Sequence, residues 1–115
     1  MQTAVDFVAE VYRLSALFPP EERFGLTAQV RRASVSVAAN IAEGSARETS
    51  PELLNFLNYA RASLKEAESM IFVARHLGFV SAADCAEALR LAVETSRMLT
   101  GLRRSIGMRS RKTRG

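Results

Sequence analysis

The sequence of 115 residues is poor in the side chains that build reactive or cross-linked sites. It has one cysteine, Cys85, one histidine, His76, and no tryptophan. A single cysteine excludes an intrachain disulfide and a cysteine-rich metal site, and a single histidine gives little support to a histidine-based catalytic triad. Neither a glycine-rich phosphate loop nor the Glu-x-x-His repeat of a di-iron bundle occurs. We therefore expect no enzyme, no cofactor and no bound metal.

Long hydrophobic runs are also missing. No stretch approaches the ~18 consecutive apolar residues that a membrane span requires, and the first residues lack the basic-then-apolar pattern of a signal peptide. With 48% apolar and 24% charged residues, the length suits one domain. The lone cysteine suits a reducing compartment. We expect a cytoplasmic protein of a single domain with no membrane partner.

Acidic residues are absent from the last part of the chain, where basic residues gather. Glu94 is the last acidic residue, and six of the 16 basic residues fall in the last thirteen positions. The preceding body holds the other ten basic residues against all 12 acidic ones, a net charge of −2. Such asymmetry is typical of a protein with an anionic partner, RNA or DNA before a membrane. The candidate nucleic-acid-binding residues are Arg103, Arg104, Arg109, Arg111, Lys112 and Arg114.

Proline and glycine are few, and several of them separate long stretches with helical apolar spacing. The pair Pro19-Pro20 ends the first stretch, Pro51 opens the third, and Gly78 follows the third. The spacing predicts helices over residues 3–17, from 24 or 26 to 44, over 50–76 and over 81–106. Long helices with short links favour an antiparallel up-down bundle. We expect an all-α four-helix bundle domain over residues 1–107 and a disordered basic tail over residues 108–115.

The third predicted helix carries more apolar surface than a lone bundle needs to bury. Its core seam repeats at four-three spacing from Leu53 to Ala74. A helix in a bundle buries about three sevenths of its surface, yet further apolar residues adjoin this seam. The surplus suggests contacts between protomers, and it consists of Phe56, Tyr59, Met70, Phe72, Val73 and Leu77.

A polar stripe runs along the second predicted helix beside its apolar seam. Its members recur every three or four residues, and Glu43 with Arg47 has the favourable order of an ion pair. Three interpretations stay open: a solvated face, a polar network between helices or protomers, and a surface for a ligand or nucleic acid. The stripe consists of Gln29, Arg32, Ser36, Asn40, Glu43 and Arg47.

The run from Gln29 to Gly44, followed by Ser45-Ala46-Arg47, resembles the four-helix-bundle family of 23S rRNA intervening sequence proteins. The likeness covers about residues 2–106 and continues to the Leu77-Gly78-Phe79 turn. It implies a homopentameric ring of antiparallel four-helix bundles. The family includes the accessory variability protein of diversity-generating retroelements, which partners a reverse transcriptase and binds nucleic acid.

Two functions follow as expectations. The first is a non-enzymatic homo-oligomer that binds RNA or DNA without sequence preference, through the basic tail and the ring surface. The alternative is a protein-interaction scaffold that partners a reverse transcriptase or another nucleic-acid enzyme. The polar stripe or the exposed apolar residues would then form the contact.

Overall fold

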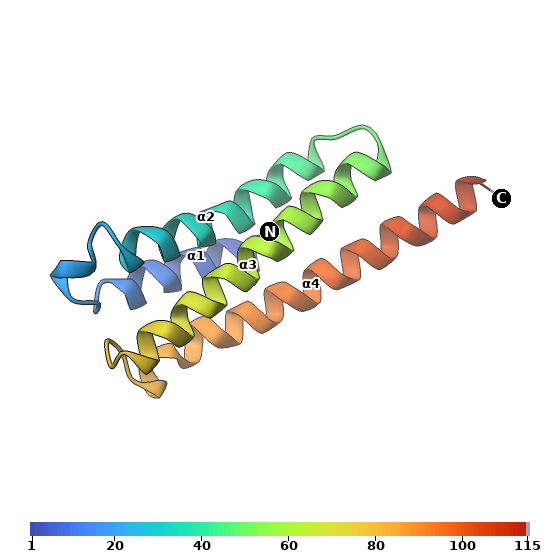
Figure 1. The fold of residues 1–115 in the computed structure, drawn as a ribbon. Helices are drawn as coiled ribbons and strands as arrows, with labels where there is room; N and C mark the ends of the chain where they lie inside the picture. Colours follow the sequence, from blue (N-terminus) through green and yellow to red (C-terminus); the bar gives the residue numbers. More distant parts are fainter. Residues whose placement is uncertain (115) are drawn as a thin grey trace.

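The computed structural model describes the backbone of residues 1–114 and the side chains of residues 1–108. In this part of the chain four α-helices form, and no strand. They are α1 (Gln2–Ser15), α2 (Leu26–Ser45), α3 (Ser50–His76) and α4 (Ala82–Arg114), with one turn of 3-10 helix, η1 (Pro20–Glu22), between α1 and α2. Successive helices run antiparallel (Figure 1). The predicted all-α four-helix fold is confirmed.

Local sequence signals set the ends of α3 and the start of α4. Thr49 caps α3, because its hydroxyl accepts a hydrogen bond from the Glu52 amide at 3.4 Å. Gly78, with φ of +79°, ends the helix in the left-handed conformation that glycine adopts without strain. The Phe79 amide then donates to the Ala74 carbonyl and the Gly78 amide to the Arg75 carbonyl, which is the Schellman pattern.

A reciprocal pair of hydrogen bonds opens α4. The Asp84 amide donates to the Ser81 hydroxyl at 3.1 Å, and the Ser81 amide donates to the Asp84 carboxylate at 2.9 Å. The hydrogen bonds from Ser81 lower the pKa of Asp84 below its usual value, because they favour the charged carboxylate. This capping box starts α4 where the sequence predicts it.

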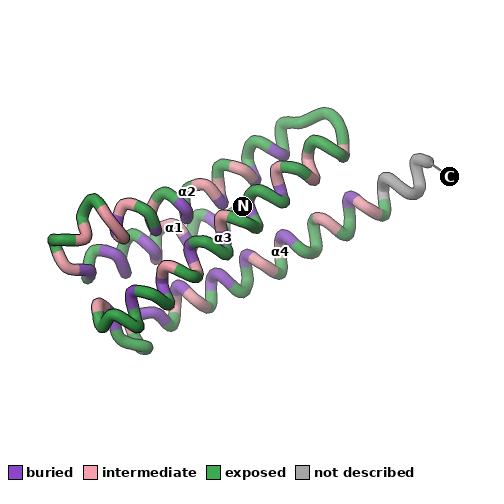
Figure 2. Tube along the Cα trace, in the orientation of Figure 1, coloured by how far each residue is buried: buried purple, intermediate pink, exposed green. Residues whose placement is uncertain are grey.

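The core lies along the axis that the four helices enclose. The backbone of each helix lies next to those of its two neighbours around the bundle, and among the described residues the backbones of the diagonal pairs α1–α3 and α2–α4 lie farther apart. Buried positions recur at helical spacing along every helix (Figure 2). None of the described helices combines the length and apolar composition that a membrane crossing requires. The largest side chains that are almost fully enclosed include Phe7, Leu14, Val30, Val37, Leu57, Leu64, Ile71 and Leu99.

The helices differ greatly in length, and this shapes one end of the molecule. At 1.5 Å per residue, the 14 residues of α1 span about 21 Å and the 33 residues of α4 about 50 Å. The Met1 amino group lies 3.6 Å from the Met98 sulfur, so α1 begins beside the middle of α4. The rest of α4 continues about 24 Å beyond α1. The part of the bundle beside α4's second half therefore lacks α1.

The helical backbone continues past the point where the sequence analysis placed a disordered tail. We expected regular structure to end at residue 107, but α4 runs to Arg114. The physical reason is local, because no proline follows Pro51 and arginine, lysine and methionine all favour helices. Gly101 and Gly107 lie within α4 without ending it. The basic residues thus continue the helical register of the bundle.

Candidate nucleic-acid interface

The second half of α4 carries the cations that the sequence analysis assigned to nucleic acid. Figure 1 shows this part of α4 running beside α3, with its last turns extending past the other helices toward the C-terminus. Arg103 and Arg104 belong to the side chains that the structure describes. The side chains of the other four candidates, Arg109, Arg111, Lys112 and Arg114, lie outside the described residues.

Arg103 and Arg104 have different environments. Arg104 is exposed, whereas Arg103 is partly buried, and its Nε atom is enclosed without a hydrogen-bond partner among the described side chains. Both line an open hollow of about 540 Å³ along α4, together with Thr100, Gly107 and Met108. The Arg104 guanidinium is therefore accessible to solvent, whereas part of the Arg103 guanidinium is not.

Arg97 is a further exposed cation, which the sequence analysis did not single out. Arg97, Arg104 and Arg111 follow one another at intervals of seven residues, two helical turns, so their backbone positions share one face of α4. We call these three residues the arginine stripe. Seven residues rise about 10.5 Å in a helix. A search for charge periodicity could have found the stripe if the fourth helix had been predicted to continue past residue 106.

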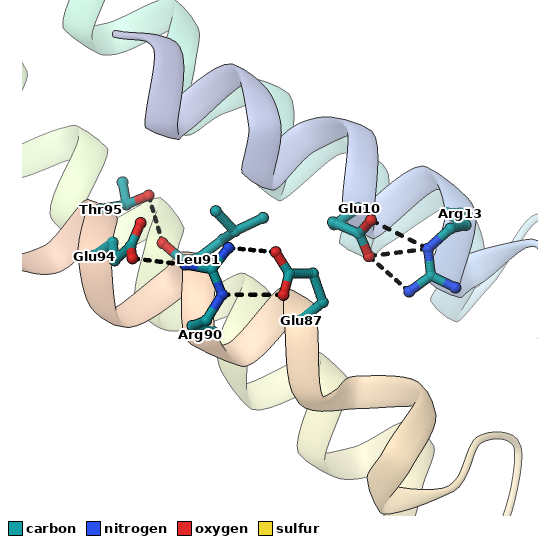
Figure 3. Close-up of polar contacts among 7 residues, drawn as sticks. All are labelled: Glu10, Arg13, Glu87, Arg90, Leu91, Glu94 and Thr95. Carbon is teal, nitrogen blue, oxygen red and sulfur yellow. Dashed lines mark hydrogen bonds and ion pairs between the residues drawn. The ribbon is translucent and has the colours of Figure 1, made fainter.

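Arg90 occupies the preceding position at the same spacing, but it is neutralised. Its guanidinium bonds to the carboxylates of Glu87 and Glu94, the latter at 2.6 Å (Figure 3). The hydrogen bond to Glu87 is the main cause that raises the pKa of Arg90 above its usual value. On α1, Glu10 pairs with Arg13 in the same manner at 2.6 Å. Within the described residues, Arg97 and Arg104 have no such ion pair, so free positive charge begins at Arg97.

The structure brings the polar stripe of α2 against α3, and part of it forms a network between these helices. The hydroxyls of Ser36 and Ser63 lie 2.8 Å apart. The side-chain amide of Asn40 donates through Nδ2 to the Ser36 carbonyl at 2.8 Å and to the Ser36 hydroxyl at 3.0 Å. Gln29 and Arg32 line a hollow of about 350 Å³ on the same side, beside Ser63 and Glu66.

The end of the polar stripe contacts aromatic residues of α3 that the sequence analysis assigned to protomer contacts. The Arg47 guanidinium pairs with Glu43 at 2.9 Å and lies 4.7 Å from the centre of the Phe56 ring. Phe56 in turn meets Tyr59 edge to face, with 5.8 Å between the ring centres. Tyr59 is 56% exposed. Two exposed surfaces thus lie on either side of α3. One is cationic and lies on α4, and the other, between α2 and α3, combines polar and aromatic side chains.

Exposed apolar side chains form a third surface over α1 and α2. On α1, Met1, Val5 and Tyr12 are each more than 40% exposed and fall on one side of the helix. Val35 of α2 belongs to the same surface, because Arg31, one turn before it, places its guanidinium 4.7 Å from the Tyr12 ring. We call Met1, Val5, Tyr12 and Val35 the α1–α2 face.

A fourth surface lies on α3, diagonally across the bundle from α1. Val73 and Leu77, one turn apart, are about half exposed. Met70 adjoins them and is partly buried. We call Met70, Val73 and Leu77 the α3 face. Of the surplus apolar residues predicted on this helix, Phe56 is partly buried, while Tyr59 and Phe72 are exposed.

Residues that support chemistry are sparse in the described structure. Among residues 1–108 no group of histidine, cysteine, aspartate and glutamate side chains could hold a metal ion. Cys85 is buried, and this burial raises the pKa of its thiol because it disfavours the thiolate. Its environment is that of a small core residue.

Comparisons with known proteins agree with the fold. Residues 1–101 match the family described as 23S rRNA-intervening sequence protein. A crystal structure from Bacteroides thetaiotaomicron, described as a protein of unknown function from the S23 ribosomal protein family, superimposes with a TM-score of 0.81 at 18% sequence identity. The alignment covers 89% of this chain and 95% of that chain. No curated protein sequence matches the chain.

Proposed function

The chain belongs to the family of 23S rRNA-intervening sequence proteins, and from this premise we propose that it is a non-enzymatic, oligomeric nucleic-acid-binding protein. The second half of α4 holds RNA or DNA by its phosphates. Guanidinium groups suit this task, because each can donate two parallel hydrogen bonds to a phosphate. Contacts to the phosphate backbone carry no sequence information, so the binding is independent of sequence.

The observation that carries this proposal is the separation of charge along α4. Up to Glu94 the exposed arginine of α4 is neutralised, because Arg90 forms ion pairs with the carboxylates of Glu87 and Glu94. Beyond Glu94 the chain has seven basic residues and no acidic one. Arg97 and Arg104 are exposed, and neither forms an ion pair with a described residue. Exposed cations without a neighbouring carboxylate attract a polyanion.

Salt dependence tests the proposal. We expect labelled RNA and DNA of arbitrary sequence to bind with similar affinity, and the affinity to fall about a thousandfold between roughly 50 and 200 mM salt if six or more phosphates are contacted. Fluorescence anisotropy titrations over this range measure the slope. Absence of binding at the lowest salt concentration, or strong preference for one sequence, would contradict the proposal.

Self-association is the second part of the proposal. The α1–α2 face and the α3 face are exposed on different helices of one chain, so one copy can offer each face to a different neighbour. A contact between the α1–α2 face of one copy and the α3 face of the next is head-to-tail, and such contacts form a ring when the rotation from copy to copy closes. The family resemblance implies five copies. Several α4 extensions in one assembly would add avidity for a long nucleic acid.

Two charge substitutions test the head-to-tail contact. We expect Val35→Glu and Val73→Glu each to give monomers, because a carboxylate buried without a partner costs several kcal/mol. Each variant keeps one intact face, so an equimolar mixture should form a one-to-one dimer. Light scattering coupled to size-exclusion chromatography measures the masses. If only one of the two variants dissociates, the contact is not head-to-tail through these faces.

The exposed apolar faces also support a second candidate function, a scaffold that docks a nucleic-acid enzyme such as a reverse transcriptase. Contiguous apolar surface on a soluble chain marks an interaction site of some kind. A wild-type chain that remains monomeric at high concentration would favour this candidate, since the two faces would then be free for another protein.

A further inference from the structure

A small hollow with an unusual lining lies between α2 and α3, at the end of the polar stripe. Its volume is about 210 Å³. Two aromatic rings, a guanidinium, an amide and a carboxylate converge on it. The lining residues are Arg47, Glu52, Asn55, Phe56 and Tyr59.

The close approach of α2 and α3 builds this hollow. A methyl carbon on Gly44 would lie 2.9 Å from Leu53 Cδ1 and 3.0 Å from Phe56 Cβ, so glycine permits the contact. The contact sets Phe56 beneath Arg47, whose guanidinium is 4.7 Å from the ring centre. Phe56 and Tyr59 are held edge to face, at 88°. The cluster is thus fixed by packing, although Tyr59 itself is more than half exposed.

The chemistry of the lining selects among possible occupants. Arg47 is already paired with Glu43, and Glu52 adds a second carboxylate, so the hollow does not attract a phosphate. An aliphatic side chain would leave the amide of Asn55 and the carboxylate of Glu52 without partners. A flat ring with a hydrogen-bonding edge suits both halves of the lining, because aromatic and guanidinium planes stack on its faces while polar groups meet its edge.

We infer that this hollow stacks one unpaired nucleobase of a single-stranded nucleic acid, with Tyr59 as the stacking surface; the inference rests on the proposed function. In a duplex, both the faces and the pairing edge of each base are occupied, so only an unpaired base fits. Charged grooves that follow the phosphates and aromatic side chains that stack the bases commonly occur together in proteins that bind single strands.

The location of the hollow agrees with a strand that binds by its phosphates to α4 and by one base to Tyr59. α3 lies between α2 and α4, and the second half of α4 runs beside the half of α3 that carries Tyr59 (Figure 1). At least the width of α3, roughly 10 Å, therefore separates the arginine stripe from the stacking site. Asn58 and Ala62, one turn apart on α3, are exposed and uncharged. Neither of these two positions places a carboxylate in the path of a nucleic-acid strand that crosses α3.

The test compares single-stranded and duplex RNA as ligands of the full chain. We expect Tyr59→Ala to weaken binding of a short single strand about 5- to 100-fold, the range for loss of one stacked base, and to leave duplex binding unchanged. Tyr59→Phe should retain the affinity, because the ring remains. The salt slope should not change, because tyrosine carries no charge. A 2-aminopurine base in the strand should be quenched by wild type and by Tyr59→Phe, and not by Tyr59→Ala.

Phe72→Ala is the matched control, since Phe72 lies on the same helix and is 51% exposed, against 56% for Tyr59. We expect this variant to bind both ligands like wild type, and circular dichroism to show unaltered unfolding for all variants. If Tyr59→Ala binds the single strand as tightly as wild type while the salt slope persists, the stacking site is wrong and the proposed function stands. If wild type binds no nucleic acid at low salt, the proposed function itself fails.

Discussion

Removing basic residues of α4 that follow Glu94 is expected to lower nucleic-acid affinity at about 50 mM salt by a factor of roughly a thousand or more. The variant carries Arg97→Gln and Arg104→Gln and ends after Met108, which removes six positive charges. Each neutralised phosphate contributes about 0.7 to the salt slope on a single strand, so the slope should fall by about four. Anisotropy titrations at several salt concentrations measure both quantities.

A matched variant separates the position of the charges from their number. Arg13→Gln with Arg90→Gln removes two arginines, as does Arg97→Gln with Arg104→Gln, but Arg13 and Arg90 are paired with carboxylates. We expect the paired arginines to matter far less, because their charge is already neutralised locally. Equal losses from the two double variants would show that only net charge matters and would remove the arginine stripe from the mechanism.

The same substitution at two helical glycines is expected to change stability in opposite directions. Gly44→Ala should cost about 1–3 kcal/mol, because the added carbon would overlap Leu53 and Phe56 in a packed contact. Gly101→Ala should gain about 0.5–1 kcal/mol, since no atom lies within 4 Å of the added carbon and alanine favours the helix. Urea unfolding followed by circular dichroism measures both differences.

The glycine pair also tests how α2 and α3 are packed. If Gly44→Ala were as stable as wild type, the two helices could separate at little cost. The packing of α2 against α3 would then not fix Phe56 beneath Arg47. Gly101→Ala serves as the control, because it shares the change in helix propensity and lacks the steric one. A destabilised Gly101→Ala would indicate that α4 does not hold its helical backbone at this position.

Much of the fold could be predicted from short-range patterns. The four-three spacing from Leu53 to Ala74 predicted the buried side of α3, and Leu57, Leu64 and Ile71 are enclosed there. Pro51 and Gly78 predicted its ends. These features depend on residues within one or two helical turns of each other, so the linear sequence contains all the partners. The extent of α4 was missed, because the apolar spacing that predicted this helix ends at Ile106 while the helical backbone continues to Arg114.

The candidate site could be predicted from the sequence only in part. The sequence showed the cations of α4 and the polar stripe of α2, but it left three interpretations of that stripe open. The Ser36–Ser63 contact favours a network between helices for its middle. The hollow at Tyr59 could not be predicted, because its lining comes from two helices whose relative register decides which side chains meet.

By itself, the sequence determined where the helices begin, which side of each is buried and where positive charge gathers, because periodicity, capping residues and composition are local properties. Only the tertiary structure decided that Ser36 meets Ser63, that Arg47 covers Phe56, and that Tyr59 remains about half exposed. Such facts depend on which helix faces overlap and at what register. Contacts between distant segments set that register, and no single segment encodes it.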